Sequence, residues 1–202
     1  MIRALILSGC LLLSPRAEAF DPSVIDAASM ERMVGGGQVV LVEEYPDGRL
    51  KLVTGGTLVK APPQKVWDLI SDYETYSDWM PQTTEVTVSN RTAKRADAHF
   101  VLDFQFSVIS KTVEYTTRHT FEPPHAIRWT LVEGDFNTSV GAWHLVPAKG
   151  GTSTLVFYST FTDLTSMGWI VRALLEEQPT MEVAIQGSTA LMVVKSVKEK
   201  LE

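Results

Sequence analysis

The chain has 202 residues, of which 45% are hydrophobic and 21% are charged, and its formal net charge is −6. These values are typical of one globular domain and exclude disordered and collagen-like chains. The acidic balance argues against a nucleic-acid partner, because binding to a phosphate backbone needs clustered Lys and Arg. No apolar run reaches the roughly 20 residues that a membrane-spanning helix needs.

Residues 1–19 have the pattern of a secretory signal peptide. An apolar run follows one positive residue, and Ala17 and Ala19 form a small-x-small cleavage site. We therefore expect cleavage after Ala19 and a secreted or periplasmic protein. One alternative is a buried N-terminal helix, which Pro15 disfavours. The other is a lipoprotein signal in which Cys10, the single cysteine, would carry the lipid.

Residues 20–48 are expected to form an N-terminal extension of one helix and one strand. The helix begins near Asp21 and ends at the glycine triplet 35–37, and the Val-rich strand covers 38–44. A turn at 46–48 connects it to a second strand over residues 49–59, which predicts a hairpin.

A helix follows Pro62, because apolar residues from Val66 to Tyr73 recur at spacings of three and four. A short helix or turn carries Trp79 and Met80 and ends at Pro81. Residues 83–162 then alternate in hydrophobicity with a period of two, broken by tight turns, which predicts an antiparallel meander.

The last forty residues change to a helical period. They predict a short amphipathic helix over 165–178, a break at Pro179, and a long helix that ends near Leu201. One stripe of the long helix collects small and medium apolar side chains, namely Val183, Gly187, Ala190, Val194, Val197 and Leu201, with Leu191 beside them.

Several stretches resemble the START-like SRPBCC superfamily, in its polyketide cyclase/dehydrase and lipid-transport branch, which includes coenzyme Q-binding START-like proteins. The stretches are APPQKVW at 61–67, DYE at 72–74, WMP at 79–81, VEGDF at 132–136 and GAWHLVP at 141–147. The resemblance covers residues 49–202. It implies an α+β helix-grip fold, in which a curved antiparallel sheet wraps around the long C-terminal helix.

The resemblance also implies a cavity between the sheet and the last helix that holds a lipid, quinone, sterol or polyketide-like molecule. Small residues on the helix stand opposite large aromatic residues on the strands, and this leaves either room for a ligand or close helix–sheet contact. We expect the ligand-binding residues to be Trp79, Met80, Phe100, Phe104, Tyr115, His119, Trp129, Trp143, Phe157, Phe161, Gly187, Ala190, Leu191 and Val194.

Catalytic signatures are missing from the sequence. It contains no G-x-S-x-G, P-loop, H-E-x-x-H or G-x-G-x-x-G pattern, and its four His residues lack ligand spacing. We therefore expect no catalytic residue, no metal and no cofactor. Tyr115 and His119 share one strand face and Arg118 takes the other, but the sequence does not decide which face lines the cavity.

Met167, Trp169 and Ile170 lie at the start of the predicted helix at 165–178. They are candidates for transient contact with a bilayer, because Trp suits the membrane interface, although packing against the sheet gives the same spacing. Three functions remain open. The favoured one is an exported binding protein for a hydrophobic small molecule, and the others are a polyketide cyclase/dehydratase-type enzyme and an interaction module with a collapsed cavity.

Overall fold

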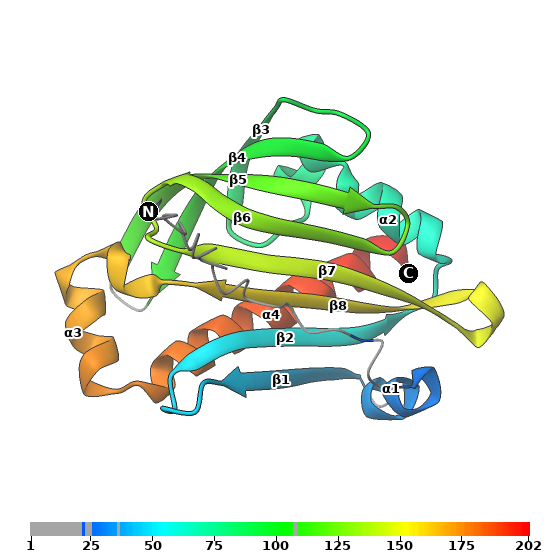
Figure 1. The fold of residues 1–202 in the computed structure, drawn as a ribbon, viewed down its shortest axis with the longest axis horizontal. Coiled ribbons are helices and arrows are strands. Elements are labelled where there is room, and N and C mark those ends of the chain that lie inside the picture. The colour runs from blue at the N-terminus through cyan, green and yellow to red at the C-terminus, as the bar shows by residue number, and fades with distance from the viewer. Residues whose placement is uncertain (1–21, 23–25, 36, 107–108) are drawn as a thin grey trace, which may run out of the picture.

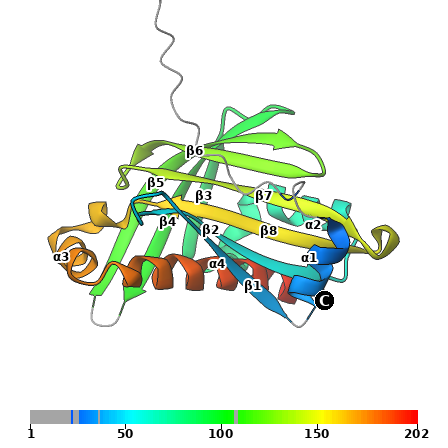
Figure 2. The same ribbon diagram turned by 60° about the horizontal axis from the view of Figure 1, so that its bottom comes forward.

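A computed structural model describes residues 22, 26–35, 37–106 and 109–202. The signal-peptide and Cys10 predictions lie outside these residues. The chain forms one curved eight-stranded sheet with a long helix, α4, across one face (Figures 1 and 2). The strands are β1 (Gln38–Glu44), β2 (Leu50–Val59), β3 (Thr83–Ser89), β4 (Arg95–Phe106), β5 (Ile109–Glu122), β6 (Ala126–Gly134), β7 (Ser139–Ala148) and β8 (Ser153–Thr162).

The helices follow the predicted order. They are α1 (Ala27–Val34), α2 (Pro63–Ser71), α3 (Trp169–Glu177) and α4 (Thr180–Leu201), with short 3-10 helices η2 (Tyr73–Asp78), η3 (Lys149–Gly151) and η4 (Leu164–Met167). Among the described residues, no helix is both long and apolar enough to cross a bilayer.

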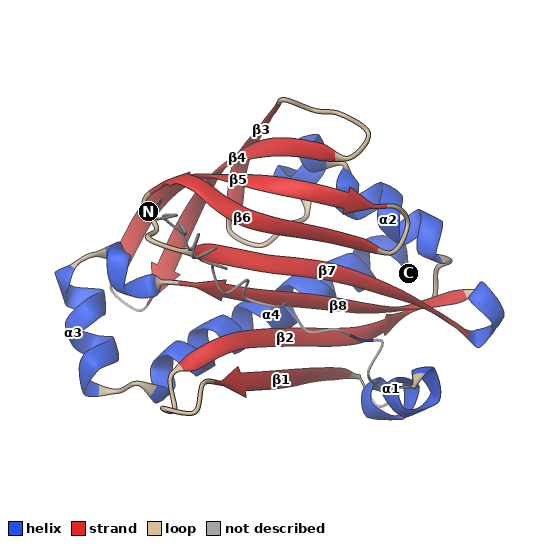
Figure 3. Cartoon of the chain, in the orientation of Figure 1, coloured by secondary structure: helices blue, strands red, loops and turns tan. Residues whose placement is uncertain are grey.

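The sheet runs β1-β2-β8-β7-β6-β5-β4-β3, and every neighbouring pair is antiparallel. Strands β3 to β8 are therefore the predicted meander, while the β1–β2 hairpin joins it through β8 (Figure 3). The α+β helix-grip fold expected from the sequence is confirmed.

Helix α2 closes one end of the space between the sheet and α4. Pro62 and Pro63 start the helix, where the missing amide hydrogen of proline is not needed. Its Val66 and Ile70 are fully buried and share one core cluster with Val193 and Val197 of α4. We call the sheet face toward α4 the inner face and the opposite one the outer face.

Helix α1 covers part of the outer face. The Asp26 side chain caps the helix by accepting a hydrogen bond from the Ser29 backbone amide at 2.9 Å. Met30 and Val34 of α1 pack with Leu155 and Phe157 of β8 in a separate core cluster. Strand β8 is therefore buried on both faces.

Candidate functional site

A cavity of about 110 Å³ lies between the inner face of the sheet, η2 and α4. Strands β4 to β8 supply most of its wall, and one side of α4 supplies the rest. The residues around it are Tyr76, Met80, Pro81, Gln82, Thr83, Phe100, Leu102, Phe104, Tyr115, Thr117, His119, Trp129, Phe136, Ser139, Trp143, Tyr158, Thr160, Thr162, Leu164, Ile185, Gln186, Thr189 and Val193.

Aromatic rings in contact with one another form the walls of the cavity. The Phe100 and Tyr115 rings stack with centroids 5.4 Å apart, and Phe136 meets Tyr115 edge-on at 5.1 Å. On the neighbouring strands the rings of Trp129 and Tyr158 stack at 5.4 Å. Such pairs fix the orientations of the rings, so the cavity has a defined shape with apolar walls.

His119 lines the cavity, and both of its ring nitrogens have hydrogen-bond partners. Nδ1 lies 2.9 Å from the Tyr73 hydroxyl, and Nε2 lies 2.8 Å from the Thr117 hydroxyl. Burial lowers the pKa of His119 to about 3, because the charged imidazolium would lose its hydration. The ring is therefore neutral at physiological pH, and its hydrogen bonds hold it in place.

The Tyr115 hydroxyl differs from these groups. Tyr115 lines the cavity, and its hydroxyl makes no hydrogen bond to any residue in the described part of the chain. Burial raises the pKa of Tyr115, so the phenol keeps its proton and can donate a hydrogen bond. Burial also raises the pKa of Tyr158 to about 12.

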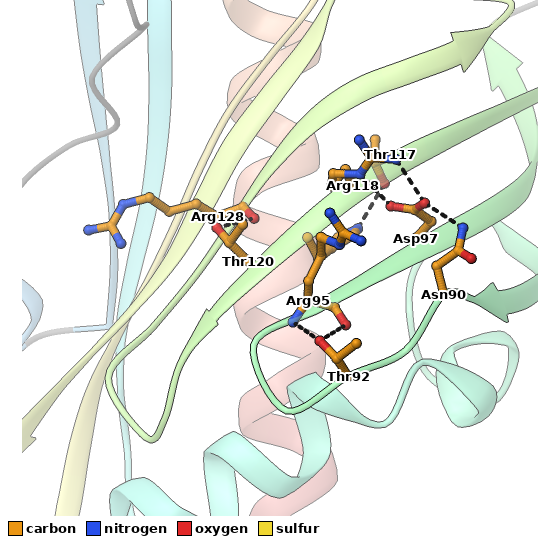
Figure 4. Close-up of polar contacts among 9 residues, drawn as sticks. Asn90, Thr92, Arg95, Asp97, Thr117, Arg118, Thr120 and Arg128 are labelled. Atoms are coloured by element: carbon orange, nitrogen blue, oxygen red, sulfur yellow. Dashed lines mark hydrogen bonds and ion pairs between the residues drawn. The ribbon is translucent and has the colours of Figure 1, made fainter.

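The question that the sequence left open, which face of β5 lines the cavity, is now answered. Tyr115 and His119 point inward, whereas Arg118 lies on the outer face. There Arg118 donates hydrogen bonds to Asp97 at 2.7 and 3.0 Å, and Asn90 donates to the same carboxylate (Figure 4). These contacts hold the pKa of Asp97 at about 2.

The structure brings half of the sequence-predicted site residues together around the cavity. They come from the turn after η2 and from β4, β5, β6 and β7, and they are Met80, Phe100, Phe104, Tyr115, His119, Trp129 and Trp143.

Three of the predicted aromatic residues lie elsewhere. Phe157 points to the outer face and packs under α1, because alternation along β8 places Tyr158 rather than Phe157 on the inner face. Phe161 is half-buried beside Leu50, also away from the cavity. Trp79 stands behind the wall, with its ring 4.9 Å from that of Tyr76.

The predicted stripe of α4 also lies outside the cavity. The carbonyl oxygen of Ala190 lies so close to β2 that a Cβ on Gly55 would approach it to 2.6 Å. Gly187 faces Val40 and Val53, and Val194 is fully buried. The Leu191 carbonyl accepts a hydrogen bond from the Gln38 side chain. Gly187 and Ala190 therefore lie in close contact with the sheet.

Another side of α4 lines the cavity, and the sequence reasoning missed it. Ile185, Thr189 and Val193 are spaced by four residues, and the helical period could have identified them as a second face. Gln186 is buried next to them. Its side chain both accepts from the backbone amide and donates to the backbone carbonyl of Thr162, each at 3.1 Å, and so fixes α4 to the end of β8.

The segment formed by η4 and α3 carries the most exposed of the five tryptophans. Trp169 is 79% exposed and Ile170 is 50% exposed. The Lys111 ammonium donates a hydrogen bond to the Met167 carbonyl at 2.9 Å and thereby links η4 to β5. Leu164 of η4 lines the cavity, so η4 covers one side of it, and α3 packs on η4.

A second, open hollow of about 1460 Å³ extends along the outer face. Charged side chains such as Glu44, Asp47, Arg118 and Arg128 line much of it, so it suits a hydrophobic molecule less well than the inner cavity. Across the described residues, no group of His, Cys, Asp and Glu side chains is arranged to hold a metal ion.

A family model described as polyketide cyclase/dehydrase and lipid transport matches residues 59–181. Solved structures share the fold. A protein from Thermus thermophilus superposes with a TM-score of 0.61 at 21% identity, covering 74% of this chain and 96% of its own. The STAR-related lipid transfer protein of Xanthomonas axonopodis gives 0.59 at 16% identity, covering 82% and 94%.

The Zhui aromatase/cyclase of a Streptomyces species gives a TM-score of 0.55 at 17% identity, covering 75% of this chain and 95% of its own. In sequence, the chain is 26% identical over 104 residues to the persistence and stress-resistance toxin PasT of Escherichia coli. That match covers 52% of this chain and 63% of the toxin.

Proposed function

Because this chain belongs to the polyketide cyclase/dehydrase and lipid transport family, we propose that it binds a hydrophobic small molecule of the lipid, quinone, sterol or polyketide-like kind in the inner cavity. The lining of the cavity supports the proposal most directly. Aromatic rings line the cavity, and they include the phenol of Tyr115, whose hydroxyl is not hydrogen-bonded by any described residue. This hydroxyl would donate to a carbonyl or hydroxyl oxygen of the ligand.

The size of the cavity restricts the mode of binding. A cavity of about 110 Å³ is near that of an engineered cavity of ~150 Å³ that binds benzene, whereas pockets for drug-sized ligands have ~300–1,000 Å³. In this conformation the site admits one small ring but not an acyl chain. A larger ligand therefore requires the walls to move apart.

We place this movement at η4 and α3. Helix α3 packs chiefly on η4 and α4, and of its residues only Leu175 is buried. A ligand that buries roughly 400 Å² of apolar surface gains about 10 kcal/mol at ~25 cal/mol/Å². Lost rigid-body freedom costs on the order of 4–15 kcal/mol, so micromolar affinity is expected.

The state of His119 favours binding over catalysis. A general acid or base works best with a pKa near the operating pH. His119 has a pKa of about 3, and Tyr73 and Thr117 occupy its two nitrogens. Neither property suits proton transfer to a ligand.

We also propose that the protein is exported and that it contacts membranes while collecting its ligand. The signal-like pattern of residues 1–19, with its predicted cleavage site after Ala19, supports export. The exposed side chains of Trp169 and Ile170 support membrane contact near Met167, because an indole that is 79% exposed suits the bilayer interface. Mass spectrometry of the native protein tests export through the mass of the processed N-terminus. Flotation with neutral phosphatidylcholine vesicles tests membrane contact, which Trp169→Ser should abolish.

The main experiment asks whether the inner cavity holds the ligand. Organic extraction of natively purified protein, followed by mass spectrometry, should release a hydrophobic compound. Thr189→Phe fills the cavity and should abolish retention of the compound. Ser188→Phe adds the same ring to the exposed side of α4 and should retain it. Protein that is empty and binds no apolar dye or lipid would contradict the proposal.

A narrower variant tests the role of Tyr115. Tyr115→Phe removes one hydroxyl and keeps the ring, so binding of ligands with a carbonyl should weaken about 5–10-fold, as expected for one hydrogen bond of ~1 kcal/mol. Binding of pure hydrocarbons should not change. Equal weakening for both ligand types would show that the hydroxyl does not anchor the ligand.

A further inference from the structure

Strand β1 forms one edge of the open sheet. It pairs with β2 on one side, and on its other side no strand lies among the described residues. The opposite edge is protected differently, because β3 packs against η2. Figure 1 shows β1 along the lower border of the sheet, outside β2. An edge strand offers unpaired amide and carbonyl groups to another strand.

The sequence of β1 gives this edge little protection. It contains four consecutive apolar residues, Val39 to Val42, and lacks the Lys and Pro that commonly block edge pairing. Glu43, Glu44 and an irregularity of register occupy only the C-terminal end of the strand. Val42 is 42% exposed although it is a strand valine.

A second exposed apolar side chain lies close to the same edge. The Gln38 side chain donates a hydrogen bond to the Leu191 carbonyl of α4 at 3.1 Å, which brings this part of α4 to the start of β1. The next residue of α4, Met192, is 40% exposed. Apolar surface on both the strand and the helix beneath it indicates a partner that extends the sheet and covers α4 as well.

We propose that β1 pairs antiparallel with β1 of a second copy of this chain, related by a two-fold axis at Leu41. In this register Val40 faces Val42 of the second copy, and Val39 and Gln38 face its Glu43 and Glu44. No two carboxylates are directly opposed, whereas an in-register parallel pairing would set each glutamate against itself. The strand is thus complementary to its own reversed copy, as a two-fold interface requires.

The same register accounts for the exposure of Val42. Cross-strand partners on one face lie with Cβ atoms about 4.5–5.5 Å apart, so Val42 would pack against Val40 of the second copy. The Val40 side chain points to the inner face, because its Cγ1 lies 3.6 Å from where a Cβ on Gly187 of α4 would be. The pair would therefore continue the inner face from one copy into the next.

Disulfide trapping tests the register. In a Cys10→Ser background, Leu41→Cys places two thiols across the proposed axis, within the reach of a disulfide. Oxidation should convert most of this variant to a covalent dimer. The matched control is Thr87→Cys, an exposed position on the other edge strand, β3, which should remain uncrosslinked. Absence of crosslinking at Leu41→Cys, or equal crosslinking of both variants, would overturn the proposal.

Light scattering of the unmodified chain gives an independent measurement. The chain should be a dimer at micromolar concentration. Val42→Lys should weaken the dimer at least 10-fold, because a charged edge residue opposes strand pairing, and its far-ultraviolet circular dichroism should remain that of the folded chain. Val132→Lys changes another exposed valine, 46% accessible on β6, and should remain dimeric. A chain that is monomeric at all concentrations contradicts the inference.

Discussion

The two sides of α4 differ in how they meet the sheet. On one side Gly187 and Ala190 bring the helix into close contact with β2, and the backbone of Gly55 lies against Ala190. On the other side Thr189 and Val193 face the cavity. Small residues on a helix therefore mark close approach here, and the open volume lies where the sheet is lined by aromatic rings.

A stripe of glycine and alanine on a helix indicates either room for a ligand or close contact with the sheet. The difference between the two sides of α4 distinguishes these interpretations. Small residues on a helix leave a cavity only if the opposite strand does not approach them. Here β2 packs directly against them. Gly55 of β2 is the counterpart of Ala190 of α4. The cavity depends instead on rings from β4 to β8 that support one another. Four predictions test this contrast.

The largest expected effect is at the close contact. A Cβ on Gly55 would lie 2.6 Å from the Ala190 carbonyl oxygen, a backbone atom that cannot move aside cheaply. Gly55→Val should therefore lower the free energy of unfolding by about 3 kcal/mol, as expected for overpacking. Urea denaturation measures the change. A loss below about 1 kcal/mol would mean that α4 moves easily away from β2.

The second prediction concerns the cavity side. The pKa of His119 is about 3 in the folded protein and about 6.5 in the unfolded chain. The unfolded chain therefore takes up a proton first as the pH falls, and stability is lost below pH 6.5. Between pH 6.5 and pH 5 the free energy of unfolding should fall by about 2 kcal/mol.

Urea denaturation across this pH range provides the measurement. His119→Gln lacks the titrating ring and keeps hydrogen-bonding capacity, so its stability should vary much less over the same range. The same dependence in both proteins would assign the effect to another group and would contradict the neutral, buried state of His119.

The third prediction compares neighbours on α4. Val194 is fully buried and is not part of the cavity lining, whereas Val193 borders the cavity. Val194→Ala should lower the free energy of unfolding by about 2 kcal/mol, and Val193→Ala by about 1 kcal/mol. Val193→Ala should in addition enlarge the cavity and admit a bulkier ligand. Thermal unfolding with and without ligand distinguishes the two variants. If both lose the same stability and respond equally to the ligand, the two sides of α4 do not differ as proposed.

The smallest effect is expected at Gly187. A Cβ there would meet Val40 and Val53 at 3.6 and 4.0 Å, which are ordinary van der Waals distances. Gly187→Ala should therefore raise the free energy of unfolding by about 0.5–1 kcal/mol through helix propensity. Calorimetry can detect this gain. A loss of stability would show that the helix lies closer to β1 and β2 than these distances indicate.

The sequence predicts the elements of this fold well, because each carries a local signal. Pro62 and Pro63 start α2, Pro179 separates α3 from α4, and period-two alternation defines the meander. The fold class follows from their order. These signals act within a few residues, so they do not depend on how the sheet curves.

The residues of the candidate site are harder to predict, because the side on which a residue lies is a tertiary property. Alternation on β8 separates Phe157 from Tyr158, but both sides of the strand are buried, one by α1 and the other by the inner core. Hydrophobicity therefore cannot tell which side faces the cavity. On β5 both faces carry polar residues, so the sequence does not show whether Tyr115 and His119 or Arg118 faces the cavity. The structure shows that Arg118 pairs with Asp97 on the outer face.

Gly141 has a consequence for spectroscopy. Because it lacks a side chain, the indole of Trp129 lies over β7 and stacks on Tyr158, which also contacts Trp143 with ring centroids 4.7 Å apart. Two of the five tryptophans thus line the cavity. Ligand occupancy of the cavity can therefore be followed in the unlabelled protein by the wavelength and intensity of its tryptophan fluorescence.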